Sequence, residues 1–157
     1  MKFLQLTFLV ALIGGLGLLT SCKPDEKVVP SIEEVQFKLL SKEWTVSEVR
    51  FGPGSTDRST EYDGMKLTIS DESSASIGVY DYFVSGRPAL SPWPEKGTWS
   101  FDENEPESLI MRIDDGLAVS YLVTSNQLQL SFNYTGAGFA GRVSAVEGNW
   151  IFLFTSN

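Results

Sequence analysis

Few side chains in this chain could carry out chemistry. The 157 residues include 12 basic residues, 20 acidic residues, one cysteine and no histidine. Without histidine the chain lacks the commonest general base and the usual nitrogen ligand of zinc. This inventory excludes a Ser-His-Asp hydrolase, a Cys-His protease and a zinc hydrolase. We therefore predict no catalytic residue, no metal site and no cofactor, and we expect that the protein is not an enzyme.

The most interesting polar group is Tyr80-Asp81-Tyr82, because it lies within a predicted strand. If the odd-numbered residues of this strand face inward, Asp81 is buried and needs a partner, for which Arg50 and Arg112 are the candidates. If the two tyrosines face inward, their rings line the interior and Asp81 is solvated. Alternation alone leaves both arrangements open.

Carboxylates also gather in two predicted turns, Asp102 to Glu105 and Asp114-Asp115. Oxygen ligands of this kind can attract calcium, but neither turn has the spacing of a calcium-binding loop, so we interpret both as solvated turns. The run Gly136 to Gly141 has the spacing of a dinucleotide-binding loop, yet no βαβ unit surrounds it. We interpret residues 134–148 as a connection, with a lid over the barrel mouth as the functional alternative.

The single cysteine, Cys22, ends the run Leu19-Thr20-Ser21-Cys22. Lys2 precedes an apolar stretch that is typical of a secretory signal and is too short and too rich in glycine to span a membrane. The run resembles the lipobox of bacterial lipoproteins. That resemblance implies cleavage before Cys22, a diacylglyceryl group on its thiol and acylation, as by palmitate, of the new amino group.

An anchor of several acyl chains gives stable membrane attachment without a transmembrane helix. We therefore expect the protein in the cell envelope, held to the outer membrane on its periplasmic or its surface-exposed face. Removing residues 1–21 takes away one lysine and no acid, so the formal charge changes from −8 to −9. Such an acidic chain is not expected to bind nucleic acid.

Hydrophobic patterning predicts a tether, a short helix and a set of strands. Residues 23–30 are polar and contain two prolines, which is typical of a tether. Ser31 and Glu34 form a capping-box pattern, and Ile32, Val35 and Leu39 then share one helical face. The helix is predicted to end near residue 42.

Eight strands are predicted after the helix, because the remaining chain alternates between apolar and polar residues. Their ranges are 43–51, 65–69, 77–83, 96–102, 108–113, 117–124, 127–133 and 149–155. The apolar phase slips between Val46 and Val49, which predicts a bulge in the first strand. Eight antiparallel strands paired in sequence order can close, so we predict an all-β, up-and-down barrel after one short helix.

The order of these features resembles the lipocalin-like lipoproteins of Bacteroidetes-type bacteria. The resemblance covers residues 37–157 and rests on the lipobox, the tether, Trp44-Thr45-Val46, Gly97-Thr98-Trp99-Ser100-Phe101 and the final aromatic strand. It divides the chain into a signal peptide (1–21), a segment with the lipidated cysteine, the tether and the start of the helix (22–36), and a barrel domain (37–157). Lys42 stands where first strands of lipocalin type usually have the glycine of Gly-x-Trp.

A barrel of eight strands can hold one small ligand or can be filled by side chains. Aromatic residues are abundant enough for either, and the candidate ligand-binding residues are Trp44, Tyr82, Trp99, Tyr121, Phe132 and Trp150. The first hypothesis is a membrane-anchored lipoprotein that binds a small apolar or amphipathic ligand. The alternative is a filled barrel that contacts a partner protein, unidentified from the sequence, through loops 85–94 and 134–148. Trp93 is then either an exposed anchor or packed over the barrel end.

Overall fold

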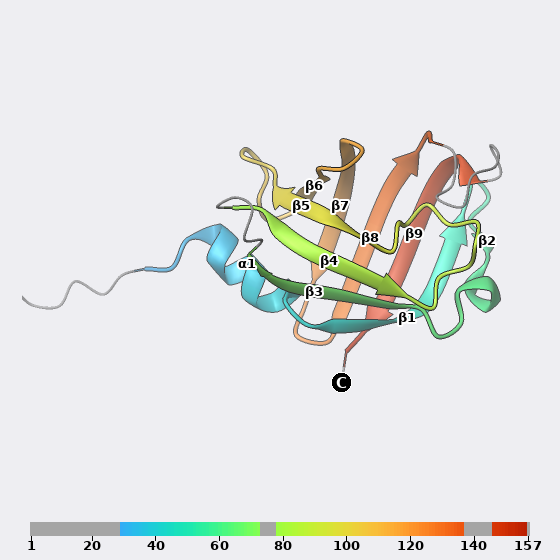
Figure 1. Ribbon diagram of the computed structural model, residues 1–157, viewed down its shortest axis with the longest axis horizontal. Coiled ribbons are helices and arrows are strands. Elements are labelled where there is room, and N and C mark those ends of the chain that lie inside the picture. Colours follow the sequence, from blue (N-terminus) through green and yellow to red (C-terminus); the bar gives the residue numbers. More distant parts are fainter. Residues whose placement is uncertain (1–28, 73–77, 137–145, 157) are drawn as a thin grey trace, which may run out of the picture.

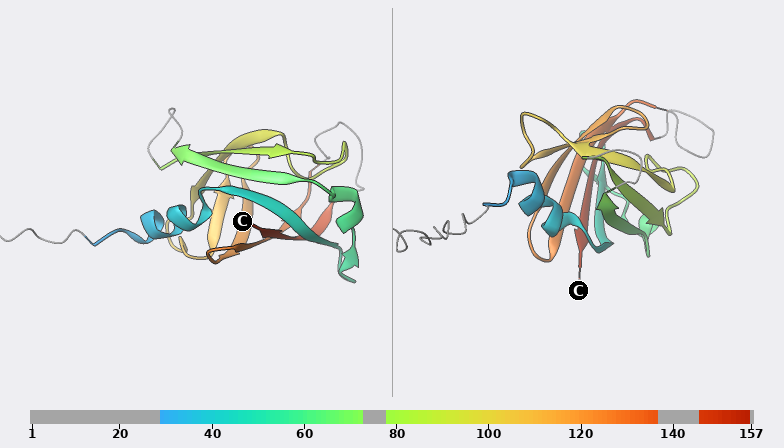
Figure 2. Two further views of the ribbon diagram at one scale, coloured as in Figure 1. Left: turned by 90° about the horizontal axis from the view of Figure 1, so that it is seen from below. Right: turned by 60° about the vertical axis from the view of Figure 1, so that its left-hand side comes forward.

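The strands form one closed antiparallel sheet in the computed structural model, which describes residues 29–72, 78–136 and 146–156 (Figures 1 and 2). Their bounds are β1 (Glu43–Phe51), β2 (Thr56–Asp57), β3 (Lys66–Glu72), β4 (Tyr80–Ser85), β5 (Lys96–Phe101), β6 (Leu109–Arg112), β7 (Leu117–Val123), β8 (Gln127–Tyr134) and β9 (Gly148–Thr155). β2 pairs only with the end of β1, the other strands pair in sequence order, and β9 pairs with β1. The predicted eight-stranded up-and-down barrel is confirmed.

β1 closes the barrel by pairing with two strands. Its first residues pair with β3, and the rest of the strand pairs with β9. The register with β9 shifts between Val46 and Glu48, which confirms the predicted bulge. Because a bulge adds one residue, Trp44 and Val49 both face the interior although five positions separate them, and both side chains are fully buried.

The burial of the β4 side chains shows which of the two arrangements of Tyr80-Asp81-Tyr82 is correct. Tyr82 and Val84 are buried, Tyr80 is partly buried against the core, and Asp81 and Phe83 are exposed. The arrangement with inward tyrosines is therefore correct. Asp81 is exposed on the outer surface of the barrel.

Helix α1 (Ile32–Leu40) begins as predicted, since the Ser31 hydroxyl accepts a hydrogen bond from the backbone N–H of Glu34 at 3.2 Å. The side of α1 that packs on the barrel is formed by Phe37 and Leu40. Leu40 is fully buried and Phe37 stacks on Tyr80 at 4.4 Å between ring centroids, whereas Ile32 remains 48% exposed. The last turn fixes this orientation, because β1 follows directly and must place its own side chains inside the barrel.

The junction between α1 and β1 is held by side-chain contacts. The indole Nε1 of Trp44 donates to the carbonyl of Leu40 at 2.9 Å. Lys42, at the position where the family pattern has glycine, donates to the carbonyl of Ser125 at 2.8 Å and lies 5.1 Å from the Trp44 ring centroid. Lysine therefore supplies a bridge between the β7–β8 turn and the start of the barrel.

Among the described residues, no helix is long and apolar enough to cross a membrane.

The two ends of the barrel differ. One end, called the α1 end here, carries α1, the turns at 102–108 and 124–126 and the end of β9 (Figure 2). The opposite end, called the loop end, carries the connections 52–65, 86–95 and 113–116, including the short helix η1 (Ser59–Tyr62), together with the end of β8 and the start of β9. The alternating strand directions of an up-and-down barrel place the predicted contact loop 85–94 at this end. Residues 137–145, and with them the lid hypothesis, lie outside the described residues.

Candidate functional site

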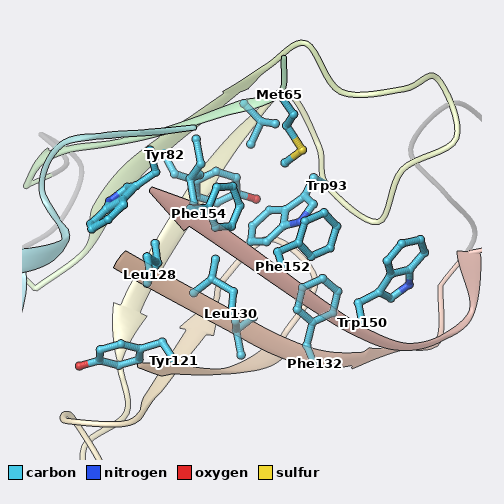
Figure 3. Packing of buried hydrophobic residues seen from close by; sticks show 14 of the residues in the cluster. Met65, Tyr82, Trp93, Tyr121, Leu128, Leu130, Phe132, Trp150, Phe152 and Phe154 are labelled. Carbon is cyan, nitrogen blue, oxygen red and sulfur yellow. The ribbon is translucent and has the colours of Figure 1, made fainter. Parts of the chain in front are cut away.

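The six aromatic residues predicted to bind a ligand are all buried in the barrel. They do not meet around one cavity. Tyr121 and Trp150 lie at opposite ends of the apolar cluster, as Figure 3 shows. The hydroxyl of Tyr121 donates to the carbonyl of Pro106, and the indole Nε1 of Trp150 donates to the carbonyl of Val146 at 2.8 Å. These two side chains therefore close the barrel near its ends.

The cavity inside the barrel has a volume of about 20 Å³. Its walls are formed by Leu67, Ile69, Tyr82, Trp93, Trp99, Ile110, Arg112, Val119 and Leu130. Only Tyr82 and Trp99 belong to the six predicted residues. The volume is close to that of a single water site, whereas pockets for small-molecule ligands start at about 300 Å³. In this structure the barrel is filled by side chains.

Trp93 fills the part of the interior where a ligand would lie. It belongs to the β4–β5 connection, yet it enters the barrel and is only 3% exposed. Its ring makes edge-to-face contacts with Tyr82, Phe132 and Phe152, with centroids 5.5 to 5.9 Å apart (Figure 3). The exposed position of Trp93 is therefore wrong, and the packed alternative is closer, although the ring enters the barrel rather than only covering its end. No signal in the sequence could have placed it, because a loop has no periodicity.

Hydrogen bonds involving Ser91 and Arg112 hold the connection that carries Trp93. The buried hydroxyl of Ser91 accepts a hydrogen bond from the backbone N–H of Trp93 at 3.1 Å. The guanidinium Nη1 of Arg112 donates to the carbonyl of Pro92 at 2.9 Å. The same guanidinium lies 5.3 Å from the Trp93 ring centroid, which is a cation–π distance. Opening the barrel at this point requires these contacts to break together.

Arg112 is a buried charge that the candidate set missed. Its Nε donates to Oδ1 of Asp115 at 2.9 Å, and its Nη2 donates to Oδ2 of the same carboxylate. The sequence contains the signal for its burial, because Ile110 faces inward and alternation turns Arg112 the same way. The proposed pairing of Asp81 with either arginine is wrong, since Asp81 is exposed.

The turn at residues 113–116 is more than a solvated turn. Asp115 pairs with Arg112, and Oδ2 of Asp114 accepts a hydrogen bond from the backbone N–H of Thr98 at 2.8 Å. In the other acidic turn, Oδ1 of Asp102 accepts hydrogen bonds from the backbone N–H groups of Asn104 and Glu105. Within residues 29–72, 78–136 and 146–156, no three acidic, histidine or cysteine side chains gather at a distance suited to a metal ion.

Three polar atoms around the cavity have no hydrogen-bond partner in the described part of the chain. They are the hydroxyl of Tyr82 and the indole nitrogens of Trp93 and Trp99. Burial raises the pKa of Tyr82 and of Tyr121, and it raises the pKa of Tyr62 to about 12. These three phenols are therefore neutral at physiological pH.

Cys22 lies outside the described residues. No known protein family, curated protein or solved structure matches this chain. The fold defines a closed, eight-stranded antiparallel barrel with an aromatic core, and the only charged side chain that is fully buried in its described part is Arg112.

Proposed function

We propose that this protein is a lipid-anchored lipoprotein of the cell envelope whose filled barrel presents its loop end to a partner protein. The observation that supports this most is the cavity of about 20 Å³, since a barrel without room for a ligand must act through its outer surface. The anchor is inferred from Leu19-Thr20-Ser21-Cys22 and the preceding signal segment. An acylated Cys22 on a polar tether leaves the whole barrel free to face a partner.

The loop end offers apolar side chains to such a partner. Phe83, Leu90 and Ile113 are large exposed hydrophobic residues in its loops or in the strand ends beside them. A groove next to them is lined by Phe83, Ala89 and Arg87. Arg87 pairs with the exposed Glu95 at 3.5 Å, so the charges beside this groove are already matched and an apolar segment would fit it.

The test has two independent measurements. Mass spectrometry of the N-terminal peptide from the producing cells should show acyl chains on Cys22, and an unmodified Cys22 would refute the anchor. A photo-crosslinking amino acid at Leu90 should capture one defined protein in intact cells. The matched control is the same amino acid at Leu122, which is 65% exposed on the barrel wall. Equal capture from both positions would refute the loop end as the contact surface.

Ligand binding remains a second candidate function, supported by one specific observation. The unpartnered polar atoms of Tyr82 and Trp99 and the guanidinium of Arg112 line the cavity beside Trp93. If the β4–β5 connection withdrew, an amphipathic ligand with an anionic group would meet both an apolar wall and a cation. Native mass spectrometry of residues 23–157 with a fatty acid tests this. Saturable uptake supports the second candidate, and no uptake favours the filled barrel.

A further inference from the structure

Helix α1 leaves an apolar face without a partner in the described part of the chain. Ile32 is 48% exposed and Val35 is 45% exposed, and Val29 just before the helix is 84% exposed. Ile32, Val35 and Leu39 share one face by helical spacing. Single exposed apolar residues are ordinary, but here they follow one another along one helix.

The barrel cannot cover this face by a small adjustment. Leu40 and Phe37 hold the neighbouring side of α1 against the barrel end, Leu40 by full burial and Phe37 by stacking on Tyr80. The carbonyl of Leu40 also accepts the hydrogen bond from Trp44. Turning Ile32 and Val35 inward would break these contacts, so their partner must come from outside the barrel.

The position of the face in the chain indicates which partner it meets. Six residues lie between Cys22 and Val29, and the seven Cα–Cα steps across them span at most about 25 Å in an extended chain. An acylated Cys22 therefore keeps α1 close to the bilayer, where the effective concentration of lipid surface is high. This step rests on the proposed anchor.

We propose that the exposed apolar face of α1 with Ile32 and Val35, together with Val29 just before the helix, lies in the headgroup region of the phospholipid bilayer that holds Cys22. An apolar helix face parallel to the membrane plane is the usual geometry of interfacial helices. The chain carries a net charge of −9 after removal of residues 1–21, so apolar burial rather than charge attraction drives this contact. α1 and the loop end lie at opposite ends of the barrel, so the loop end is the end farther from this contact (Figure 2).

The experiment attaches residues 22–157 to phosphatidylcholine nanodiscs by coupling Cys22, the only cysteine, to a maleimide phospholipid. Nitroxide headgroups in the disc then report proximity through the relaxation of backbone amide signals. We expect residues 29–36 to relax at least threefold faster than residues 86–95, with no change in 0.5 M salt. Ile32→Ser with Val35→Ser should lower the relaxation of residues 29–36 at least threefold. The matched control Leu122→Ser should leave it unchanged.

Several outcomes would overturn the proposal. Equal relaxation rates in residues 29–36 and 86–95 would contradict it, as would unchanged relaxation of residues 29–36 in the Ile32→Ser, Val35→Ser variant. Loss of the fast relaxation of residues 29–36 in 0.5 M salt would also contradict it. So would a dimer of the untethered chain that the double variant abolishes. Because the coupling to lipid is chemical, the result does not depend on acylation in cells. An unmodified Cys22 in cells refutes the anchor and with it this inference, whereas an acylated Cys22 without contact of α1 refutes only this inference.

Discussion

The carboxylate of Asp115 accepts two hydrogen bonds from the guanidinium of Arg112 and so pairs a charge that the barrel buries. The pair joins two connections at the loop end, because the same guanidinium also donates to Pro92 beside Trp93. The side chain that fills the barrel is thus tied to the β6–β7 turn. Removing either member of the pair should affect both the stability of the barrel and the position of the loop.

Asp115→Asn should therefore be strongly destabilising. The variant removes the negative charge and leaves Arg112 buried, which typically costs about 3–5 kcal/mol in unfolding free energy. Urea unfolding followed by tryptophan fluorescence measures this loss. Asp81→Asn is the matched control, because Asp81 is exposed, and it should change the unfolding free energy by less than about 0.5 kcal/mol. A similar small change in both variants would contradict the pairing.

Trp93→Ala should empty the barrel. Loss of the buried indole is expected to cost about 3–5 kcal/mol and to leave a cavity among Tyr82, Phe132 and Phe152. The Trp93→Ala variant should then bind a naphthalene-based apolar dye and raise its fluorescence, whereas the wild-type chain should not change the dye's fluorescence. Leu90→Ala, in the same connection but exposed, should behave as the wild type. Dye binding by the wild type would show that the barrel opens without the substitution.

Two buried tyrosines should respond differently to removal of their hydroxyl groups. The hydroxyl of Tyr82 has no hydrogen-bond partner among the described residues, whereas that of Tyr121 donates to the carbonyl of Pro106. Tyr82→Phe should leave the unfolding free energy equal or raise it by up to about 1 kcal/mol, because it removes an unsatisfied polar group. Tyr121→Phe should lower it by about 1 kcal/mol. Equal losses would show that Tyr82 has a polar partner.

Stability should fall at alkaline pH. The pKa of Tyr62 and of Tyr82 is raised in the folded chain, so above pH 10 the unfolded chain releases protons that the folded chain retains. Stabilisation by these neutral phenols is complete below pH 10 and is lost as the pH rises beyond it, by about 1 kcal/mol for each group at pH 11. Urea unfolding at pH 9 and pH 11 measures the difference. Tyr82→Phe should reduce it, and an unchanged difference would exclude Tyr82 as a source.

Gly97→Ala should strain the contact between β4 and the β6–β7 turn. A Cβ atom at Gly97 would lie 2.5 Å from the hydroxyl of Tyr82 and closer still to Oδ2 of Asp114. Overpacking of this kind costs about 1–3 kcal/mol in unfolding free energy. Gly54→Ala is the control, because a Cβ atom there meets no atom within 4 Å. Thermal unfolding of both variants distinguishes crowding at Gly97 from a general effect of replacing glycine.

The barrel itself could be predicted from the sequence because its signals are local. Alternation marks the strands, the two short turns at 114–116 and 125–126 mark hairpins, and the slip between Val46 and Val49 marks the bulge. Each depends on neighbouring residues only. Strand count and pairing order then follow from the need to leave no open edge.

The interior could not be predicted in the same way, because it depends on contacts between distant segments. Trp93 comes from a loop without periodicity, and its place is decided by the room left between Tyr82 and Phe152. The face of α1 that packs is chosen by the junction at Leu40 and Trp44 rather than by the apolar pattern of the helix. A helix with apolar residues over a wide arc does not show which part of that arc is buried.

The closure of β1 on β9 has a consequence for the order of folding. Every other pairing in the barrel joins strands that are near neighbours along the chain, whereas Thr45 and Thr155 meet across about 110 residues of chain. Closing so long a loop costs conformational entropy before stabilising contacts can form. We therefore expect the pairing of β1 with β9 to form last, after the meander from β3 to β9. Helix α1 then docks late, because Phe37 and Leu40 need the finished barrel end. If the proposed anchor is correct, acylation of Cys22 does not have to wait for the barrel to close.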